Sequence, residues 1–178
     1  AHPDLATNYN TNIDYDFYDS DNDAAPVDLV GDSHGTEVAG IIAARGNNSL
    51  GVVGVAYLAT MTGLRLTAGT TTDFQEAQAM SYSNGIIQVK NNSWGAPDDG
   101  VSVDGPGALM QAALENGVTN GRGGRGVVYV FSGGNGLDLA DDSNKDGYAN
   151  SPCVIAVGAV DDTGFQAYYS EPGANITV

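Results

Sequence analysis

Residues 126–136 read Gly-Val-Val-Tyr-Val-Phe-Ser-Gly-Gly-Asn-Gly, an unbroken apolar run that passes directly into a glycine-rich turn. A short run that is apolar at successive positions is typical of a strand covered on both faces. Such strands belong to parallel sheets flanked by helices. The stretch therefore predicts an interior strand of a parallel sheet with a polar loop at its carboxyl end.

The chain around this stretch alternates between short strand patterns and longer helical patterns. Strands are predicted at residues 59–66, 86–91, 126–131 and 154–160, and helices at residues 34–45, 73–83 and 106–116. Alternation of this kind indicates βαβ units. We expect an α/β fold with a mostly parallel sheet between two helical layers, a three-layer α/β/α arrangement. The sequence contains no internal repeat and no dividing linker, so the 178 residues are predicted to form one domain or most of one.

The charge balance narrows the classes of partner. With 22 acidic and 6 basic side chains the formal charge is −16, which excludes nucleic acid and favours cations or basic partners. A solvated acidic surface, as in a salt-adapted secreted protein, is the alternative. No stretch is apolar over the length needed to cross a bilayer. The single cysteine, Cys153, lies in an apolar run and is expected to be a buried small hydrophobe.

Residues 33–40 read Ser-His-Gly-Thr-Glu-Val-Ala-Gly and place His34 at the mouth of a predicted helix. The neighbouring glycine lets backbone or substrate approach closely, so His34 is a candidate catalytic base. A polar helix cap without chemistry fits these residues equally well.

Polar loops follow two of the predicted strands, at residues 92–100 and 132–136. In a parallel sheet, ligands and catalytic groups gather at the carboxyl ends of the strands. Asn135 offers a side-chain N–H there, the kind of donor that stabilises an oxyanion. Taken alone, an ordinary turn asparagine is the more common interpretation.

The acidic residues come in packets. Asp19, Asp21 and Asp23 offer hard oxygen ligands at a spacing that calcium can gather, although the glycine and distal glutamate of an EF-hand loop are missing. We favour calcium over plain solvation for this packet. A second packet, residues 138–146, could line a pocket for a cationic side chain, although a turn explains Asp146-Gly147 equally well.

A series of short motifs then follows in one order along nearly the whole chain. They are His2-Pro3-Asp4-Leu5, His34-Gly35-Thr36, Ala39-Gly40, Gly54-Val55-Ala56-Tyr57, Ser93-Trp94-Gly95, Asp98-Asp99-Gly100, Val103-Asp104-Gly105-Pro106, Gly121-Arg122-Gly123-Gly124, Gly134-Asn135-Gly136, Asp146-Gly147-Tyr148 and Tyr169-Ser170-Glu171. This series resembles the subtilisin-like serine proteases, and among them the kexin and furin branch. The resemblance implies a subtilisin-like fold and a secreted or periplasmic, calcium-dependent endopeptidase that cleaves after arginine or lysine.

The resemblance also implies roles for individual residues. His34 corresponds to the general base of an Asp-His-Ser triad, and Asn135 to the oxyanion-hole donor. Asp98 and Asp146 correspond to the carboxylates that bind a basic P1 side chain. Glu76 and Asp104 correspond to contacts with basic residues further upstream in the substrate. Without the resemblance, Glu76 would be interpreted as a solvated residue on an exposed helix face.

Three calcium sites are implied in the same way. The first comprises Asp4, Asn48 and the backbone carbonyls of Arg45, Leu50 and Val52; the second comprises Asp98, Asp141 and Glu171; the third comprises Asp16, Asp21 and Asp23. Asp138 or Asp142 could substitute for Asp141, because the loop around it is not closely similar to the family. Calcium would offset the repulsion within a chain this acidic.

The sequence departs from the family in several respects. The triad aspartate is expected just before the His-Pro-Asp-Leu motif and the serine in a Gly-Thr-Ser motif, and neither is present in these 178 residues. We therefore expect the central part of a catalytic domain, cut at both ends and inactive by itself. A prodomain or chaperone and a C-terminal domain would belong to the parent protein. Gly51, Ser143 and Lys145 stand at positions of the eukaryotic disulfides, which indicates a bacterial-type member.

Two alternatives remain open at this point. One is a calcium-binding module that keeps the fold and has lost catalysis. The other, which the sequence supports less, is an α/β ligand-binding domain.

Overall fold

A computed structural model describes residues 2–27 and 32–178 of the chain. The chain forms two compact units, Ala1–Thr71 and Thr72–Val178. The boundary falls at a run of threonines between a strand and a helix, which does not have the composition of a linker. The prediction of one partial domain over residues 1–178 stays a prediction.

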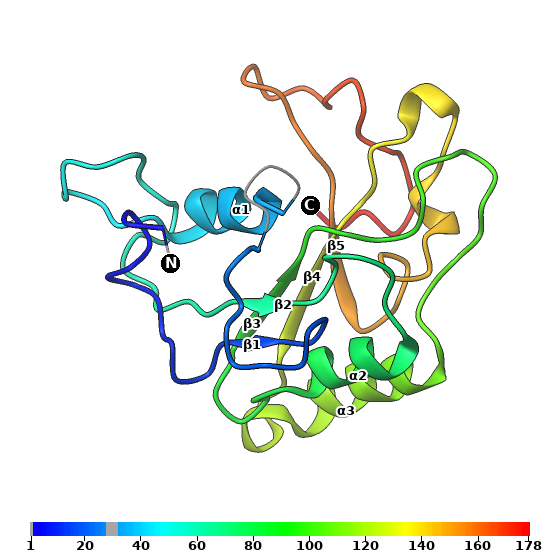
Figure 1. The fold of residues 1–178 in the computed structure, drawn as a ribbon. Coiled ribbons are helices and arrows are strands. Elements are labelled where there is room, and N and C mark those ends of the chain that lie inside the picture. Colours follow the sequence, from blue (N-terminus) through cyan, green and yellow to red (C-terminus); the bar gives the residue numbers. More distant parts are fainter. Residues whose placement is uncertain (1, 28–31) are drawn as a thin grey trace. The chain divides into compact units, whose positions relative to one another are not determined.

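Within its described residues, 2–27 and 32–71, the first unit contains one helix and one parallel strand pair (Figure 1). The helix α1 spans His34–Ala43, and strand β1 (Tyr15–Asp16) pairs with β2 (Leu64–Arg65). The predicted strand at residues 59–66 is thus reduced to two residues. β1 was not predicted, because its sequence lies within an acidic stretch without an apolar pattern.

The second unit contains a three-stranded parallel sheet in the order β3-β4-β5, with helices α2 and α3 packed against each other (Figure 1). The bounds are β3 Val89–Asn92, β4 Val128–Ser132, β5 Val154–Val157, α2 Asp73–Ser81 and α3 Ala108–Gly124, with 3₁₀ turns η1 Leu137–Leu139 and η2 Ser143–Lys145. Parallel pairing and strand–helix alternation agree with the predicted α/β class.

Local sequence explains how α2 and α3 begin. Thr72 and Gln75 form a reciprocal capping box at the start of α2. The first residue of that helix, Asp73, accepts hydrogen bonds from the backbone N–H groups of Leu109 and Met110 at 3.0 and 2.9 Å, and so caps α3 as well. One carboxylate therefore ties the two helices together.

The third helix ends later than predicted. Helical turns continue past residue 116, and non-helical backbone angles interrupt α3 only at Gly121, Arg122 and Gly123. The helix therefore persists up to the glycine-rich stretch that begins at Gly121. Gly117 lies within this continuation, where a Cβ atom would collide with the hydroxyl group of Tyr129.

The sheet of the second unit buries one face more fully than the other. Tyr129 and Phe131 of β4 are fully buried, whereas Val128 on the opposite face is 38% exposed and Ile155 of β5 is 36% exposed. The prediction that the apolar strands are covered on both faces is therefore wrong for the residues the structure describes. Cys153 is also only partly buried.

A lysine side chain caps the C-terminus of α2. Lys90 of β3 is buried, and its Nζ donates to the carbonyl oxygens of Ala79, Met80 and Tyr82, each over 2.8 Å. Cations are favoured at helix C-termini, where carbonyl groups lack helical partners. Burial lowers the pKa of Lys90 to about 7.

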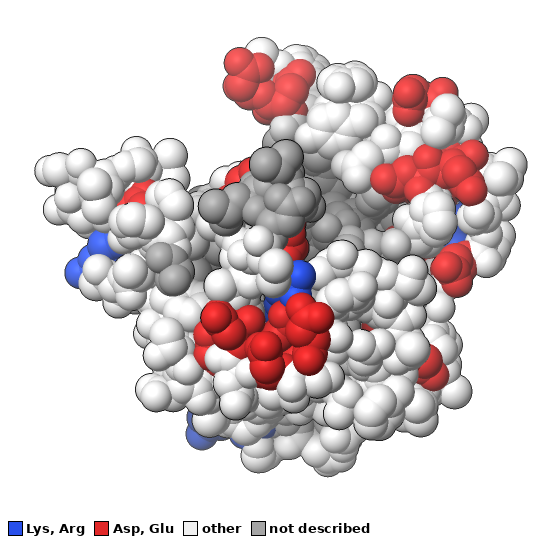
Figure 2. Space-filling view, viewed as in Figure 1, with Lys and Arg blue, Asp and Glu red and all other residues white. Residues whose placement is uncertain are grey.

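The described residues include no helix with the length and apolar character of a membrane span. Acidic side chains gather in patches on the face shown in Figure 2, as their packets in the sequence predict.

Candidate active site

Two loops at the carboxyl ends of β3 and β4 line a cleft in the second unit. Residues 93–98 after β3 and residues 132–135 after β4, together with Asp146, border a hollow of about 350 Å³. The prediction that these loops meet at one edge of the sheet is confirmed. The volume lies within the range of ligand pockets in proteins, roughly 300–1,000 Å³.

Asn135 lies on this cleft and is bound to Asp98. Its backbone N–H donates to Asp98 Oδ1 over 3.1 Å, and its side-chain Nδ2 donates to Oδ2 over 3.2 Å. Both residues are exposed. A carboxamide carries two N–H bonds, so this contact orients the group without using its whole donor capacity.

Asp146 is the buried carboxylate of the cleft. Its Oδ1 accepts hydrogen bonds from the backbone N–H groups of Tyr148 and Ala149 at 2.7 and 3.2 Å. Burial raises the pKa of Asp146, with a further contribution from nearby Asp98, although the backbone donors oppose the shift. A cationic side chain beside Asp146 would restore the ionised form.

Glycine lets the cleft wall approach this carboxylate. A Cβ atom at Gly95 would collide with Asp146 Oδ2, so the backbone can pass there only without a side chain. Trp94 precedes this glycine, and its ring packs edge-on against Phe131 and Tyr148 at centroid distances of 5.3 and 5.1 Å. The three rings form a firm apolar wall beside the carboxylate.

Glu76 and Asp104 lie in different surroundings. Glu76 is only 7% exposed, and Tyr148 donates its hydroxyl hydrogen to Glu76 Oε2 over 3.3 Å. The interpretation of Glu76 as a residue on an exposed helix face is therefore wrong. Asp104 is exposed; it forms a parallel bridge with Asp146, and its carbonyl accepts from Gly147 N at 2.7 Å. Tyr148 thus links Glu76 to the segment that holds Asp146.

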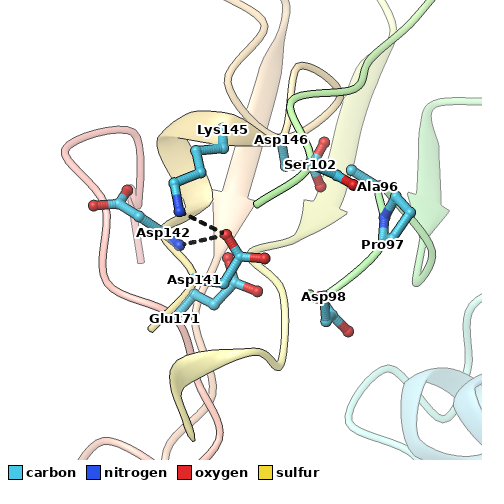
Figure 3. Close-up of a pocket in the computed structure, with 9 residues that line it drawn as sticks. All are labelled: Ala96, Pro97, Asp98, Ser102, Asp141, Asp142, Lys145, Asp146 and Glu171. Carbon is cyan, nitrogen blue, oxygen red and sulfur yellow. Dashed lines mark hydrogen bonds and ion pairs between the residues drawn. The ribbon is translucent and has the colours of Figure 1, made fainter. Parts of the chain in front are cut away.

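Five carboxylates line a pocket that adjoins the cleft, here called the acidic pocket (Figure 3). Lys145 also lines the pocket, and the carboxylates are Asp98, Asp141, Asp142, Asp146 and Glu171. Lys145 Nζ donates to Gly100 O over 2.9 Å and lies 3.4 Å from Asp141 Oδ1. The ammonium group of Lys145 thus offsets the charge at one edge of the pocket only, and the pocket keeps an excess of negative charge.

The excess of negative charge has its clearest effect on the pKa of Glu171. Its carboxylate is buried and accepts from Gly136 N at 2.9 Å. Burial raises the pKa of Glu171, and the neighbouring Asp98 and Asp141 raise it further. Asp141 behaves differently, because the Gly100 N–H and Lys145 help to lower its pKa.

The oxygen-rich donor set of Asp98, Asp141 and Glu171 fits calcium in kind. A side chain at Gly134 would collide with the Glu171 carboxylate, so this part of the pocket is kept open around hard oxygen atoms. Among residues 2–27 and 32–178, however, no three His, Cys, Asp or Glu side chains already stand in a metal-binding arrangement. A cation would have to draw these carboxylates closer together.

In the first unit, the loop at residues 45–52 surrounds Asp4. Asn48 Nδ2 donates to Asp4 Oδ1 over 2.7 Å, and Val52 N donates to Oδ2 over 2.8 Å. These two bonds lower the pKa of Asp4. Gly51, at φ +38°, passes so close to the carboxylate that a Cβ atom would collide with it.

The backbone of the same loop completes this arrangement. Arg45 N donates to Asp4 O over 3.0 Å, and Leu50 N donates to Asn48 Oδ1 over 3.1 Å. The structure therefore brings together the residues predicted for the first calcium site. The contacts that it shows are made by N–H groups of Arg45, Asn48, Leu50 and Val52, not by the predicted carbonyl oxygens.

The residues predicted for a third calcium site are engaged elsewhere. The Asp16 carboxylate binds the guanidinium of Arg65, and the carboxylates of Asp21 and Asp23 accept backbone N–H groups two residues further on. These three side chains do not fit a common cation as they stand.

His34 is the first residue of α1 and is exposed. Ser33 precedes it; its side chain caps no backbone N–H but donates to Glu37 Oε1 over 2.8 Å. The Ser33 carbonyl accepts the backbone N–H groups of Thr36 and Glu37 at 2.9 and 3.1 Å. The imidazole is thus presented at a helix N-terminus, as predicted.

Sequence reasoning missed two basic residues, Arg65 and Lys145, that bind the predicted site residues. The composition held a signal for Arg65. In a chain with 22 acidic and 6 basic side chains, an arginine inside the apolar run at residues 63–66 must have carboxylate partners to be buried.

Comparison with known proteins gives a consistent result. A family model described as "Subtilase family" matches residues 1–178. Furin-like protease 2 of Drosophila melanogaster is 42% identical over 170 residues, covering 96% of this chain and 10% of the relative. Human proprotein convertase subtilisin/kexin type 4 is 43% identical over 176 residues, covering 98% and 23%. The chain spans less than a quarter of the length of either relative.

Solved structures are similar over the same length. The Aeromonas sobria serine protease, crystallised with its chaperone, matches with a TM-score of 0.82 and 26% identity, covering 99% of this chain and 32% of that chain. A protease of Pseudoalteromonas arctica matches with a TM-score of 0.77 and 29% identity, covering 99% and 58%. A cold-adapted subtilisin-like proteinase shares the fold at 22% identity and a TM-score of 0.68. These likenesses confirm the predicted fold class.

Proposed function

Since this chain belongs to the subtilase family, we propose that the protein containing it is a serine endopeptidase that cleaves peptide chains after arginine or lysine. The observation that carries the proposal is the cleft beside Asp98 and Asp146, where one carboxylate is exposed and the other is buried. Guanidinium and ammonium groups are recognised by carboxylates in this kind of setting.

In this proposal, His34 accepts the proton of a serine nucleophile and returns it to the leaving amine. Asn135 donates an N–H to the oxygen of the scissile carbonyl as negative charge develops. The serine and the triad aspartate are expected in sequence motifs that these 178 residues do not contain. That His34 and Asn135 act on the same bond is part of the proposal.

Asp146 and Asp98 bind the P1 side chain. Asp146 supports this role because its backbone donors already hold Oδ1 in place, so a substrate cation need not order the carboxylate. Glu76 and Asp104 receive basic residues further upstream. To bind such a residue, Glu76 would exchange its contact with Tyr148 for the substrate cation.

Calcium is proposed at two places. Asp4, Asn48 and the carbonyl groups of Arg45, Leu50 and Val52 would hold one ion, and Asp98, Asp141 and Glu171 a second. When bound, calcium supplies positive charge that offsets carboxylate repulsion. A secreted or periplasmic location and assistance by a prodomain or chaperone complete the proposal.

The test uses the longer polypeptide that contains this chain, assayed against peptides that differ only at P1. Arginine and lysine peptides should be cleaved in preference to leucine and phenylalanine peptides. Asp146→Asn keeps the backbone hydrogen bonds and removes the charge, so kcat/KM for the arginine peptide should fall by about 100-fold. Preference for an apolar P1 residue would contradict the specificity.

Two further variants serve as controls. His34→Ala should abolish turnover of every peptide, which separates an enzyme from a calcium-binding module that has lost catalysis. Asp161→Asn changes an exposed carboxylate whose hydrogen bonds stay within its own turn, with Thr163 and Phe165, and should leave kcat/KM unchanged.

A further inference from the structure

Arg65 gathers three carboxylates from separate parts of the first unit. Its Nη1 binds Asp16 and, over 2.8 Å, Asp19, while its Nε donates to Asp32 Oδ2 over 2.7 Å. The Arg65 side chain is 11% exposed and lies over the ring of Tyr18, 5.7 Å from its centroid. Burial alone lowers the pKa of Arg65, but its bonds to Asp32, Asp16 and Asp19 outweigh burial and raise it.

Strand pairing and backbone hydrogen bonds hold the surroundings of this guanidinium. Arg65 lies on β2 opposite Asp16 of β1, and Phe17 N donates to the Arg65 carbonyl over 2.7 Å. Asp16 Oδ1 also accepts the backbone N–H groups of Tyr18 and Asp19 at 2.7 and 2.9 Å. Strand pairing and the turn after β1 therefore support the residues that bind the guanidinium from one side, while Nε reaches Asp32.

That bond ends at a residue that leads directly into α1. Asp32 precedes Ser33, and His34 is the first residue of the helix. Ser33 supplies no side-chain cap to the backbone of α1. The Asp32–Arg65 ion pair therefore anchors the segment that delivers the imidazole to the helix N-terminus.

We propose that Arg65, acting through Asp32, is a positioning residue for His34. The inference rests on the proposed role of His34 as general base. Arg65 touches neither substrate nor reacting atoms; it fixes where α1 begins and therefore where the imidazole stands. A shift of about 1 Å in a catalytic group can lower a rate by about 100-fold, so loss of this ion pair acts on kcat rather than on substrate binding.

The experiment measures kcat and KM of the longer polypeptide containing this chain, at saturating calcium throughout. Asp32→Ala should lower kcat by about 10- to 100-fold and leave KM within about 2-fold. Asp32→Asn keeps an oxygen acceptor for Nε and should restore most of kcat. Arg65→Lys keeps the charge but loses the planar group that binds Asp16 through Nη1 and Asp32 through Nε, so kcat should fall again.

A purely structural role would change these values in another way. It would lower the thermal midpoint and the amount of active enzyme, while kcat per active site and KM stayed as in the wild type. Active-site titration and thermal unfolding are therefore recorded for each variant. Asp161→Ala, which removes a carboxylate bonded within its own turn, is the matched control and should leave kcat unchanged.

The outcomes distinguish this inference from the proposed function. If His34→Ala retains activity, or the unmodified polypeptide has none, the proposed function fails and the inference falls with it. If His34→Ala is inactive while Asp32→Ala keeps the wild-type kcat, only the inference is overturned. Should Asp32→Ala not fold, a wild-type kcat in Arg65→Lys would overturn it.

Discussion

Two groups of carboxylates in this chain differ in how their mutual repulsion is offset. In the first unit, Asp16, Asp19 and Asp32 surround the guanidinium of Arg65, here called the Arg65 cluster. In the second unit, the acidic pocket has Lys145 at one edge, where it serves Asp141. The Arg65 cluster carries its own counter-charge, whereas the pocket keeps unmet negative charge at Glu171.

The difference separates a structural cluster from one that is prepared to bind a cation. A planar guanidinium satisfies several carboxylates at once, so the Arg65 cluster has little need of another cation. In the acidic pocket, burial and neighbouring charge raise the pKa of Glu171. A calcium ion or a basic side chain that enters the pocket would relieve this repulsion.

The largest expected change in stability comes from disrupting the Arg65 cluster. Arg65→Met removes the cation and leaves the buried Asp16 carboxylate without its partner, which should lower the free energy of unfolding by about 3–5 kcal/mol. Chemical denaturation followed by circular dichroism measures the change.

Lys145→Met is the matched control in the acidic pocket. The Lys145 side chain is 34% exposed and lies 3.4 Å from its carboxylate, so its loss should cost about 1 kcal/mol or less. Equal losses in the two variants would contradict the proposed difference between the two groups of carboxylates.

Calcium should stabilise the chain through the acidic pocket and not through the third predicted site, whose Asp16 is already bound by Arg65. An ion at about 100 times its Kd adds about 2.7 kcal/mol to the free energy of unfolding. Calcium should therefore raise the thermal midpoint relative to chelator. Glu171→Gln should remove the share of this increase that comes from the acidic pocket, and Asp21→Asn should keep the whole increase; the reverse pattern would show that calcium binds at the third predicted site instead.

Lys90 provides a third case for comparison with the Arg65 cluster and the acidic pocket. It is a buried basic side chain that is bound by carbonyl oxygens rather than by carboxylates. Its pKa is lowered to about 7 in the folded chain, while the unfolded side chain titrates near 10.5. Between these values the unfolded state binds more protons, so stability should rise with pH, by about 1 kcal/mol from pH 7 to pH 8.

The measurement is the free energy of unfolding of the wild type and of Lys90→Met at both pH values. The wild type should gain stability relative to Lys90→Met as the pH rises. A parallel change in the two proteins would mean that the carbonyl groups of Ala79, Met80 and Tyr82 keep Lys90 protonated.

Much of the fold followed from pattern. The sequence located β3, β4 and β5 and the helices α1, α2 and α3. Buried side chains recur at the period of the strand or helix that carries them, and this period can be detected in the sequence. β1 was missed because two paired residues leave no period to detect. The prediction that both faces of the sheet are covered failed for a similar reason. An apolar residue indicates that a strand can be covered, but it does not indicate which element covers it.

The candidate site divided in the same way. The motifs placed His34 at a helix start and Asn135 at a strand end, because both positions depend on local sequence. The burial of Glu76 against Tyr148 joins residues 72 positions apart, and the engagement of Asp16 by Arg65 joins residues 49 positions apart. Contacts over such separations have no local signature.

The order of residues alone determined the alternation of strands and helices, the acidic character, and the family to which the chain belongs, since these depend on short-range periodicity, composition and contiguous motifs. Tertiary structure decided which carboxylates received a cation of their own. That choice depends on distances between side chains brought together by folding, because electrostatic attraction acts through space and not along the chain.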